Sequence, residues 1–422
     1  MSSLLLECRN GHAEAVRISL DGGTDVDEAD RAGRTAFFMA CAGGHEDVVR
    51  LLIDRGADVD RARDIGATPF LVACQKGFVD VARLCLDCGA DVERAAEGLD
   101  GVTPLYVACE SGHLDVATLC LDRGAAVDVS NQNGATPLYI ASQCGHLGAA
   151  QLCLDRGAAV DRAERQGASP LFIACRFGHL DVATLLLDRG ADVELTAETG
   201  EAPLLVACGK GHTSAARLCL DRGAAVDPLD QYGWAPLHAA SAKGHADAVR
   251  LLLDRGSTSV NRGAQGGATP LHFASSSGSI SAARLLLDRG ANIYCVTPVV
   301  GETVQDAARE RGHMAMAAWL TRIGECGWTR YLSEFRYQLV VLRALVAKQR
   351  AQRVRRRAFR GKELALDFLF PGEPQPQRNK QARRYAPRLP DEIFSIIACY
   401  YWGGGLSAVE EVAAAAEAEE SE

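Results

Sequence analysis

One four-residue pattern recurs along most of the 422-residue chain and constrains its fold more than any other feature. Each copy begins with Thr, Ser or Ala, usually followed by Pro and two large residues. The copies begin at Thr35, Thr68, Thr103, Thr136, Ser169, Ala202, Ala235 and Thr269. Their steps are 33, 35, 33, 33, 33, 33 and 34 residues, and a degenerate copy begins at Thr303. A period near 33 residues predicts one supersecondary unit that is used many times.

Each unit is predicted to contain two short helices and an extended hairpin. In the copy at Thr103, the Thr is placed to cap the first helix and Pro104 suits its first turn. Gly112 breaks this helix, and a second apolar helix ends before Gly124, where a left-handed cap is expected. A helix pair this small cannot bury its apolar face alone, so we predict an all-α solenoid of stacked units. The longer steps place extra residues in the hairpins near Leu99 and Ser257.

These units resemble the ankyrin repeat over about residues 1–324. We count a partial first unit, eight full units and a degenerate last unit, since terminal repeats cap an array and depart from its pattern. The resemblance implies an ankyrin solenoid that acts as a non-enzymatic scaffold and binds partner proteins through its concave face. The tetrad His of the family stands only at His238 and His272. Phe, Tyr or Leu replaces it in the other six copies, so we do not expect its hydrogen bonds there.

The repeat also accounts for the residues that most often carry chemistry. Eight of the ten histidines follow a Gly at the turn between the two helices, and the other two are tetrad residues. Nine cysteines recur six or seventeen residues after a tetrad start, where we expect small buried side chains. Cys85 and Cys88 form a C-x-x-C pair without the second pair that a zinc site needs. No nucleophile elbow, P-loop or H-E-x-x-H motif is present. We therefore expect no catalytic residue, cofactor or metal site.

Candidate partner-binding residues follow from the resemblance. In ankyrin arrays, partners mostly contact hairpin tips and the exposed face of the first helices, so residues that break the repeat there are candidates. They are Arg34, Gln75, Lys76, Glu110, Gln143, Arg176, Phe177, Lys210, Tyr232, Trp234 and Lys243. Other residues that break the repeat at these places are Arg31, Asp64, Ile65, Gln132, Asn133, Arg165 and Glu198. Tyr232 and Trp234 stand out because such residues are frequent interface hot spots; the alternative is a packing contact between neighbouring hairpins.

The composition changes after residue 324. Residues 1–324 contain 29 Lys and Arg against 41 Asp and Glu. Residues 325–390 contain 16 against 5, and residues 391–422 contain none against 8. The modest net charge of −9 therefore combines an acidic array, a basic segment and an acidic tail.

A long basic amphipathic helix is predicted within residues 325–370, from Tyr331 to about Arg360. Its apolar first half is expected to close the end of the stack. Its basic second half has three interpretations: a helix that docks on the acidic array, a nuclear-import or nucleic-acid patch, or a calmodulin-type target.

The remaining segments are predicted as a Pro-rich basic linker at 371–388, an amphipathic helix at 389–403 and an Ala/Glu-rich acidic tail at 404–422. The helix resembles the opening helix of an F-box, with the pattern Leu-Pro-x-Glu-Ile. Its candidate adaptor-binding residues are Leu389, Pro390, Ile393, Phe394 and Ile397. This resemblance implies docking on a Skp1-type ubiquitin-ligase adaptor, so a ligase substrate receptor is an alternative function. The other interpretation is a helix that folds back on the basic helix.

The sequence also indicates a cellular setting. No apolar run reaches the ~18–20 residues of a membrane span. The N-terminal residues show no secretory pattern, so we expect the fifteen cysteines to remain reduced thiols in the cytoplasm, with the nucleus as the alternative. Protein partners are expected, nucleic acid is the less favoured partner, and no membrane partner is expected.

Overall fold

The computed structural model describes residues 2–299 and 301–332. Residues 1–331 form one compact unit. Most of the predicted basic helix, together with the Pro-rich linker, the F-box-like helix and the acidic tail, lies outside the described residues. None of the described helices is long and apolar enough to cross a membrane.

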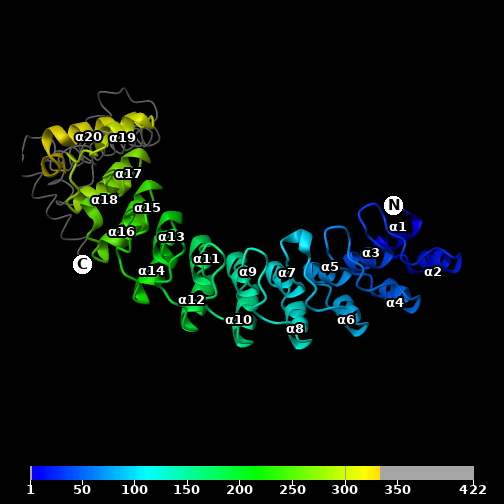
Figure 1. Cartoon of the computed structure of the whole chain (residues 1–422). Helices are drawn as coiled ribbons and strands as arrows, with labels where there is room; N and C mark the ends of the chain where they lie inside the picture. The colour runs from blue at the N-terminus through cyan, green and yellow to red at the C-terminus, as the bar shows by residue number, and fades with distance from the viewer. Residues whose placement is uncertain (1, 300, 333–422) are drawn as a thin grey trace, which may run out of the picture. The chain divides into compact units, whose positions relative to one another are not determined.

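Ten helix pairs follow one another along the described residues, and each pair has an inner and an outer helix (Figure 1). The inner helices are α1 (Ser3–Asn10), α3 (Ala36–Gly43), α5 (Pro69–Lys76), α7 (Pro104–Ser111), α9 (Pro137–Cys144), α11 (Pro170–Phe177), α13 (Pro203–Lys210), α15 (Pro236–Ala242), α17 (Pro270–Ser276) and α19 (Val304–Glu310). The outer helices are α2 (Ala13–Asp21), α4 (Glu46–Asp54), α6 (Val79–Asp87), α8 (Leu114–Asp122), α10 (Leu147–Asp155), α12 (Leu180–Asp188), α14 (Thr213–Asp221), α16 (Ala246–Asp254), α18 (Ile280–Asp288) and α20 (Met314–Cys326). Short 3-10 helices at Glu97–Leu99 and Ser259–Asn261 stand where the repeat period lengthens.

Local sequence explains where each inner helix begins and ends. The Thr103 hydroxyl accepts a hydrogen bond from the backbone N–H of Tyr106 at 3.3 Å, and Pro104 occupies the first turn. Gly112 ends α7 in the left-handed conformation, with φ of 74°. A Cβ at this position would also lie 2.7 Å from Nδ1 of His146 in the next unit. Glycine is therefore required both by the turn and by the neighbouring ring.

Stacking of the units builds one continuous apolar core. Each inner helix packs on the next inner helix, and each outer helix from α2 to α16 packs on the next outer helix. The tetrad residues Leu105, Leu138, Leu171 and Leu204 come from four successive units and are at most 1% exposed. The predicted all-α ankyrin-type solenoid is thus confirmed, because each unit covers the apolar face of its neighbour.

Histidines at the helix turns contact neighbouring units. His146 and His179 place Nε2 at 3.1 and 2.9 Å from the carbonyl oxygens of Glu110 and Gln143 in the preceding units. At the retained tetrad position, His238 Nδ1 accepts from the backbone N–H of Ala235, and Nε2 lies 2.8 Å from the carbonyl oxygen of Arg262. Burial lowers the pKa of His238, which keeps this ring neutral.

The recurrent cysteines meet in pairs across unit boundaries. The Sγ atoms of Cys109 and Cys153 lie 3.8 Å apart, and those of Cys175 and Cys219 lie 3.6 Å apart. All four thiols are buried, so these positions take small apolar side chains, as predicted. Cys88 of the C-x-x-C pair is exposed instead.

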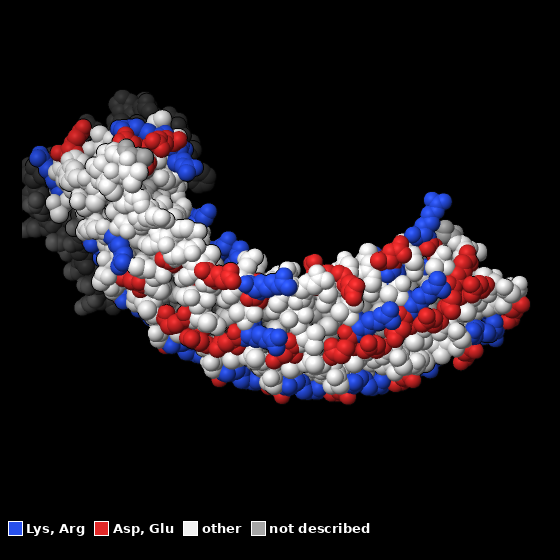
Figure 2. All heavy atoms as spheres, viewed as in Figure 1, with Lys and Arg blue, Asp and Glu red and all other residues white. Residues whose placement is uncertain are grey.

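Arg and Asp residues at the ends of the outer helices form a ladder of ion pairs between units. Seven pairs join the Arg of one Asp-Arg-Gly segment to the Asp of the preceding unit, with N–O distances of 2.5–2.9 Å. Figure 2 shows basic and acidic residues alternating along the edge that carries the outer helices. Cys88 replaces the Arg that would face Asp54, and the Trp328 indole donates to Asp288 at the last unit.

An aromatic cluster covers the last helix pair. The indole of Trp319 donates to the Tyr331 hydroxyl at 3.1 Å, and the rings of Trp328 and Tyr331 stack with centroids 5.8 Å apart. A helical stretch begins at residue 328 and continues to residue 332, the last described residue. It begins three residues before Tyr331, the predicted start of the basic helix.

Candidate protein-binding groove

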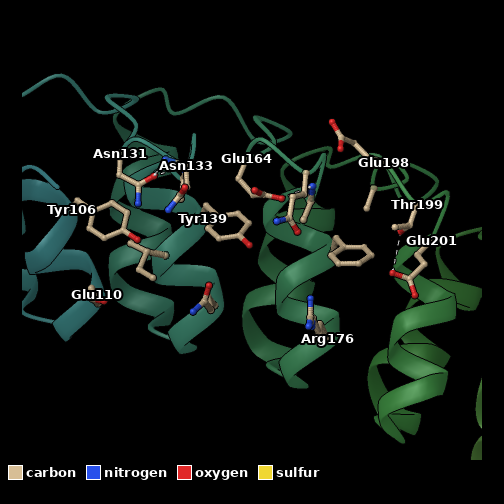
Figure 3. Close-up of a pocket in the computed structure, with 17 residues that line it drawn as sticks. Tyr106, Glu110, Asn131, Asn133, Tyr139, Glu164, Arg176, Glu198, Thr199 and Glu201 are labelled. Carbon is tan, nitrogen blue, oxygen red and sulfur yellow. Dashed lines mark hydrogen bonds between the residues drawn. The ribbon is translucent and has the colours of Figure 1, made fainter. Parts of the chain in front are cut away.

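A cavity of about 500 Å³ opens between the inner helices and the hairpins of the central units. We call it the central groove. It is lined by Tyr106, Glu110, Asn131, Asn133, Ala135, Tyr139, Ile140, Gln143, Glu164, Gln166, Ala168, Phe172, Arg176, Ala197, Glu198, Thr199 and Glu201. These residues come from α7, α9 and α11 and from three consecutive hairpins (Figure 3). The groove therefore crosses several units, as a site for an extended ligand must.

Aromatic side chains form the floor of the central groove. Tyr106, Tyr139 and Phe172 occupy the same tetrad position in three successive units, where the family carries His. In Figure 3 the two tyrosine side chains project from neighbouring inner helices beneath the hairpin residues. They are 7% and 8% exposed, so most of each ring packs in the array. Burial, with the Glu110 and Glu164 carboxylates as smaller causes, raises the pKa of Tyr106 and raises that of Tyr139 to about 12.

The hairpins form a wall that backbone hydrogen bonds hold in place. The N–H of Arg165 donates to the Asn133 carbonyl, and the N–H of Glu198 donates to the Gln166 carbonyl, both at 2.9 Å. At the hairpin bases, the Asp128 carboxylate accepts from the Ala159 N–H at 3.0 Å. Since successive hairpins are bonded to each other, the wall is formed before a ligand arrives.

Charged groups in the central groove are mostly acidic. The lining contains four carboxylates, those of Glu110, Glu164, Glu198 and Glu201, and one guanidinium, that of Arg176. The Glu164 carboxylate accepts from its own hairpin at Ala168, and that of Glu201 accepts from Thr199. Within the described residues, no group of three or more His, Cys, Asp and Glu side chains could hold a metal ion.

Three of the eleven sequence candidates line the central groove: Glu110, Gln143 and Arg176. Of the further departures from the repeat, Asn133 and Glu198 also line it. Five other candidates are exposed elsewhere on the array: Gln75, Lys76, Phe177, Lys210 and Lys243.

The hairpin candidates outside the groove have different surroundings. Arg34 forms an ion pair with Asp30 of its own hairpin at 2.6 Å. Trp234 packs against Phe273 in α17 of the next unit, with ring centroids 4.5 Å apart. This is a packing contact, but with an inner helix and not with a neighbouring hairpin. Tyr232 on the same hairpin is 50% exposed.

Sequence reasoning missed the aromatic floor and part of the wall. The missed residues that line the groove include Tyr106, Tyr139, Phe172, Asn131, Glu164, Gln166, Thr199 and Glu201. The signal for the floor was present in the sequence, because three successive units carry a large aromatic residue where the family has His. From the sequence alone, that replacement predicts only a loss of hydrogen bonds.

Fold and groove together define a helical-repeat protein of the type that binds other proteins. A family model of three ankyrin repeats matches residues 2–63, 62–131, 105–197 and 193–264, and a one-repeat model matches residues 266–298. The chain therefore belongs to the ankyrin-repeat family, whose repeats are generally protein-interaction modules.

Two further comparisons complete this result. No curated protein matches the chain in sequence. The crystal structure of the human ASB11 ankyrin repeat domain is similar to it, with 25% sequence identity and a TM-score of 0.49. That match covers 53% of this chain and 99% of the other.

Proposed function

We propose that this chain is a non-enzymatic scaffold that binds an extended segment of a partner protein in the central groove. The observation that carries the proposal is the continuity of the groove across α7, α9 and α11 and the hairpins beside them. Neighbouring helices pack about 8–10 Å apart, and an extended chain advances about 3.3–3.6 Å per residue. A segment of roughly six to nine residues would span these units.

The proposal is tested by selecting random peptides on the full-length chain. The affinity of each selected peptide is then measured for the unchanged chain and for Gln143→Trp, a variant whose new side chain fills the middle of the groove from α9. Gln151→Trp is the matched control, since it makes the same change on the exposed face of α10 in the same unit. We expect Gln143→Trp to weaken binding at least about tenfold, equal to 1.4 kcal/mol, and Gln151→Trp to leave it unchanged. Peptides that bind both variants equally would remove the groove from the proposal.

A ubiquitin-ligase substrate receptor is the second candidate function. The sequence pattern at Leu389–Ile397 supports it, although these residues lie outside the described part of the chain. The test is capture of a Skp1-type adaptor by the full-length protein and by an Ile393→Asp, Ile397→Asp double variant. Capture by the unchanged protein alone would support this function. Equal capture, or no capture, would remove it.

A nuclear or nucleic-acid-associated regulator is the third interpretation, and it rests on the basic residues 348–360. Contacts with phosphates release counterions, so affinity for nucleic acid must fall steeply as salt rises. A flat response to salt would exclude a phosphate-led contact. For the compartment, we propose the cytoplasm or nucleus, because closely spaced free thiols suit a reducing environment.

A further inference from the structure

The chemistry of the central groove indicates which kind of segment it binds. Its four carboxylates form no ion pair within the described residues, and neither does the guanidinium of Arg176. Along the outer edge, by contrast, each Arg of the ladder already has an Asp partner. The groove is thus a concave surface with an excess of unpaired negative charge, which attracts cations.

The tyrosines of the floor give an independent indication of a polar ligand. Tyr106 and Tyr139 are more than nine-tenths buried, and their hydroxyls reach the groove (Figure 3). Neither hydroxyl has a hydrogen-bond partner within residues 2–299 and 301–332. A neutral tyrosine hydroxyl can accept a hydrogen bond from a guanidinium or ammonium group.

The spacing of the units constrains how a ligand presents its charges. Equivalent groove residues repeat every 33 residues, as Tyr106, Tyr139 and Phe172 do, and so recur once per stacked helix. Helices stack about 8–10 Å apart. A polyproline II segment has three residues per turn and rises about 9 Å per turn. Every third side chain of such a segment therefore points in the same direction, and successive ones meet successive units of the array.

We propose that the central groove binds a basic segment of a partner protein in the polyproline II conformation, with Lys or Arg at every third position. This inference rests on the proposed function and specifies its ligand. Cationic side chains at this spacing would lie above Tyr106 and Tyr139 in turn. Each of these residues has a carboxylate nearby, that of Glu110 for Tyr106 and that of Glu164 for Tyr139. Arg176 opposes a cation at one place, so it sets a local preference for a residue without positive charge.

The test uses fluorescence anisotropy with the full-length chain and labelled peptides of about twelve residues, at an ionic strength near 0.15 M. The first peptide repeats Arg-Pro-Ser. The second has the same composition with its arginines contiguous, and the third replaces Arg by Glu. Glu110→Lys reverses one groove charge on α7. Its matched control is Asp115→Lys, the same charge change on exposed α8 of the same unit.

We expect the spaced basic peptide to bind about tenfold more tightly than the contiguous one, and the acidic peptide not to bind. Glu110→Lys should weaken the first peptide about tenfold, Asp115→Lys should change it less than about twofold, and Arg176→Glu should strengthen it. Equal affinity of the two basic peptides, or equal losses in Glu110→Lys and Asp115→Lys, would overturn the inference.

The random-peptide selection separates this inference from the proposed function. If the selected peptides lack basic residues but lose affinity in Gln143→Trp, the groove binds proteins and the basic preference is wrong. If no selected peptide responds to Gln143→Trp, both proposals fail.

Discussion

Leu186→Ala tests whether the shared core holds the array together. Leu186 lies in the last turn of α12, and its side chain is 0% exposed. Truncation to Ala removes the equivalent of about three methylene groups, at about 0.8 kcal/mol each. The residual cavity adds to this loss because neighbouring units cannot collapse fully, so the total cost should be roughly 2–5 kcal/mol. Unfolding of the full-length chain in urea, followed by circular dichroism, measures it.

Arg189→Ala is the matched control from the next turn of the same region. Arg189 pairs with Asp155 at 2.8 Å, but the two side chains are 35% and 50% exposed. Such exposed pairs contribute about 0–1 kcal/mol, so this variant should lower the free energy of unfolding only slightly. An equal decrease in the free energy of unfolding in both variants, or a larger decrease in Arg189→Ala, would refute the claim that the continuous apolar core stabilises the array.

Three further outcomes follow from the contacts. Cys88→Arg should restore the missing ladder pair with Asp54 and raise the unfolding free energy by up to about 0.5–1 kcal/mol; a lower value in urea unfolding would contradict the ladder. A disulfide reagent should modify the exposed Cys88 and Cys144 rapidly and the ten buried cysteines only on unfolding, as peptide mapping can show. The Arg34 side chain lowers the pKa of Asp30 to about 2, so Asp30→Asn should reduce the melting temperature at neutral pH, and the difference should disappear as the pH falls from about 4 to 2.

The repeat fold could be predicted because its signals are local and repeated. Thr or Ser before Pro fixes where each inner helix begins, and Gly112 and its equivalents fix where it ends. The same signals predicted the buried cysteines, since Cys109 and Cys153 stand where other units have Ser or Leu. Ten similar units carry the same residue types at their helix starts, helix ends and buried positions. A weak pattern in one unit is therefore supported by the others.

The groove could be predicted only in part, because it depends on which residues of different units share one surface. Glu110, Gln143 and Arg176 were found as departures from the repeat. Glu164 was missed because its place on the wall depends on how neighbouring hairpins are bonded, and this is a contact between units. Trp234 was selected for its type, and its packing on Phe273 comes from a tertiary contact that spacing alone does not reveal.

Protection of Cys144 from alkylation tests the central claim most directly. Cys144 ends α9, which lines the groove, and it is exposed, as is Cys88 on the outer edge of the array. The rate of iodoacetamide modification at each site would be measured by mass spectrometry with and without a saturating selected peptide. We predict that the peptide slows modification of Cys144 and leaves that of Cys88 unchanged. Unchanged rates at both sites, under conditions where the peptide is bound, would contradict binding in the central groove.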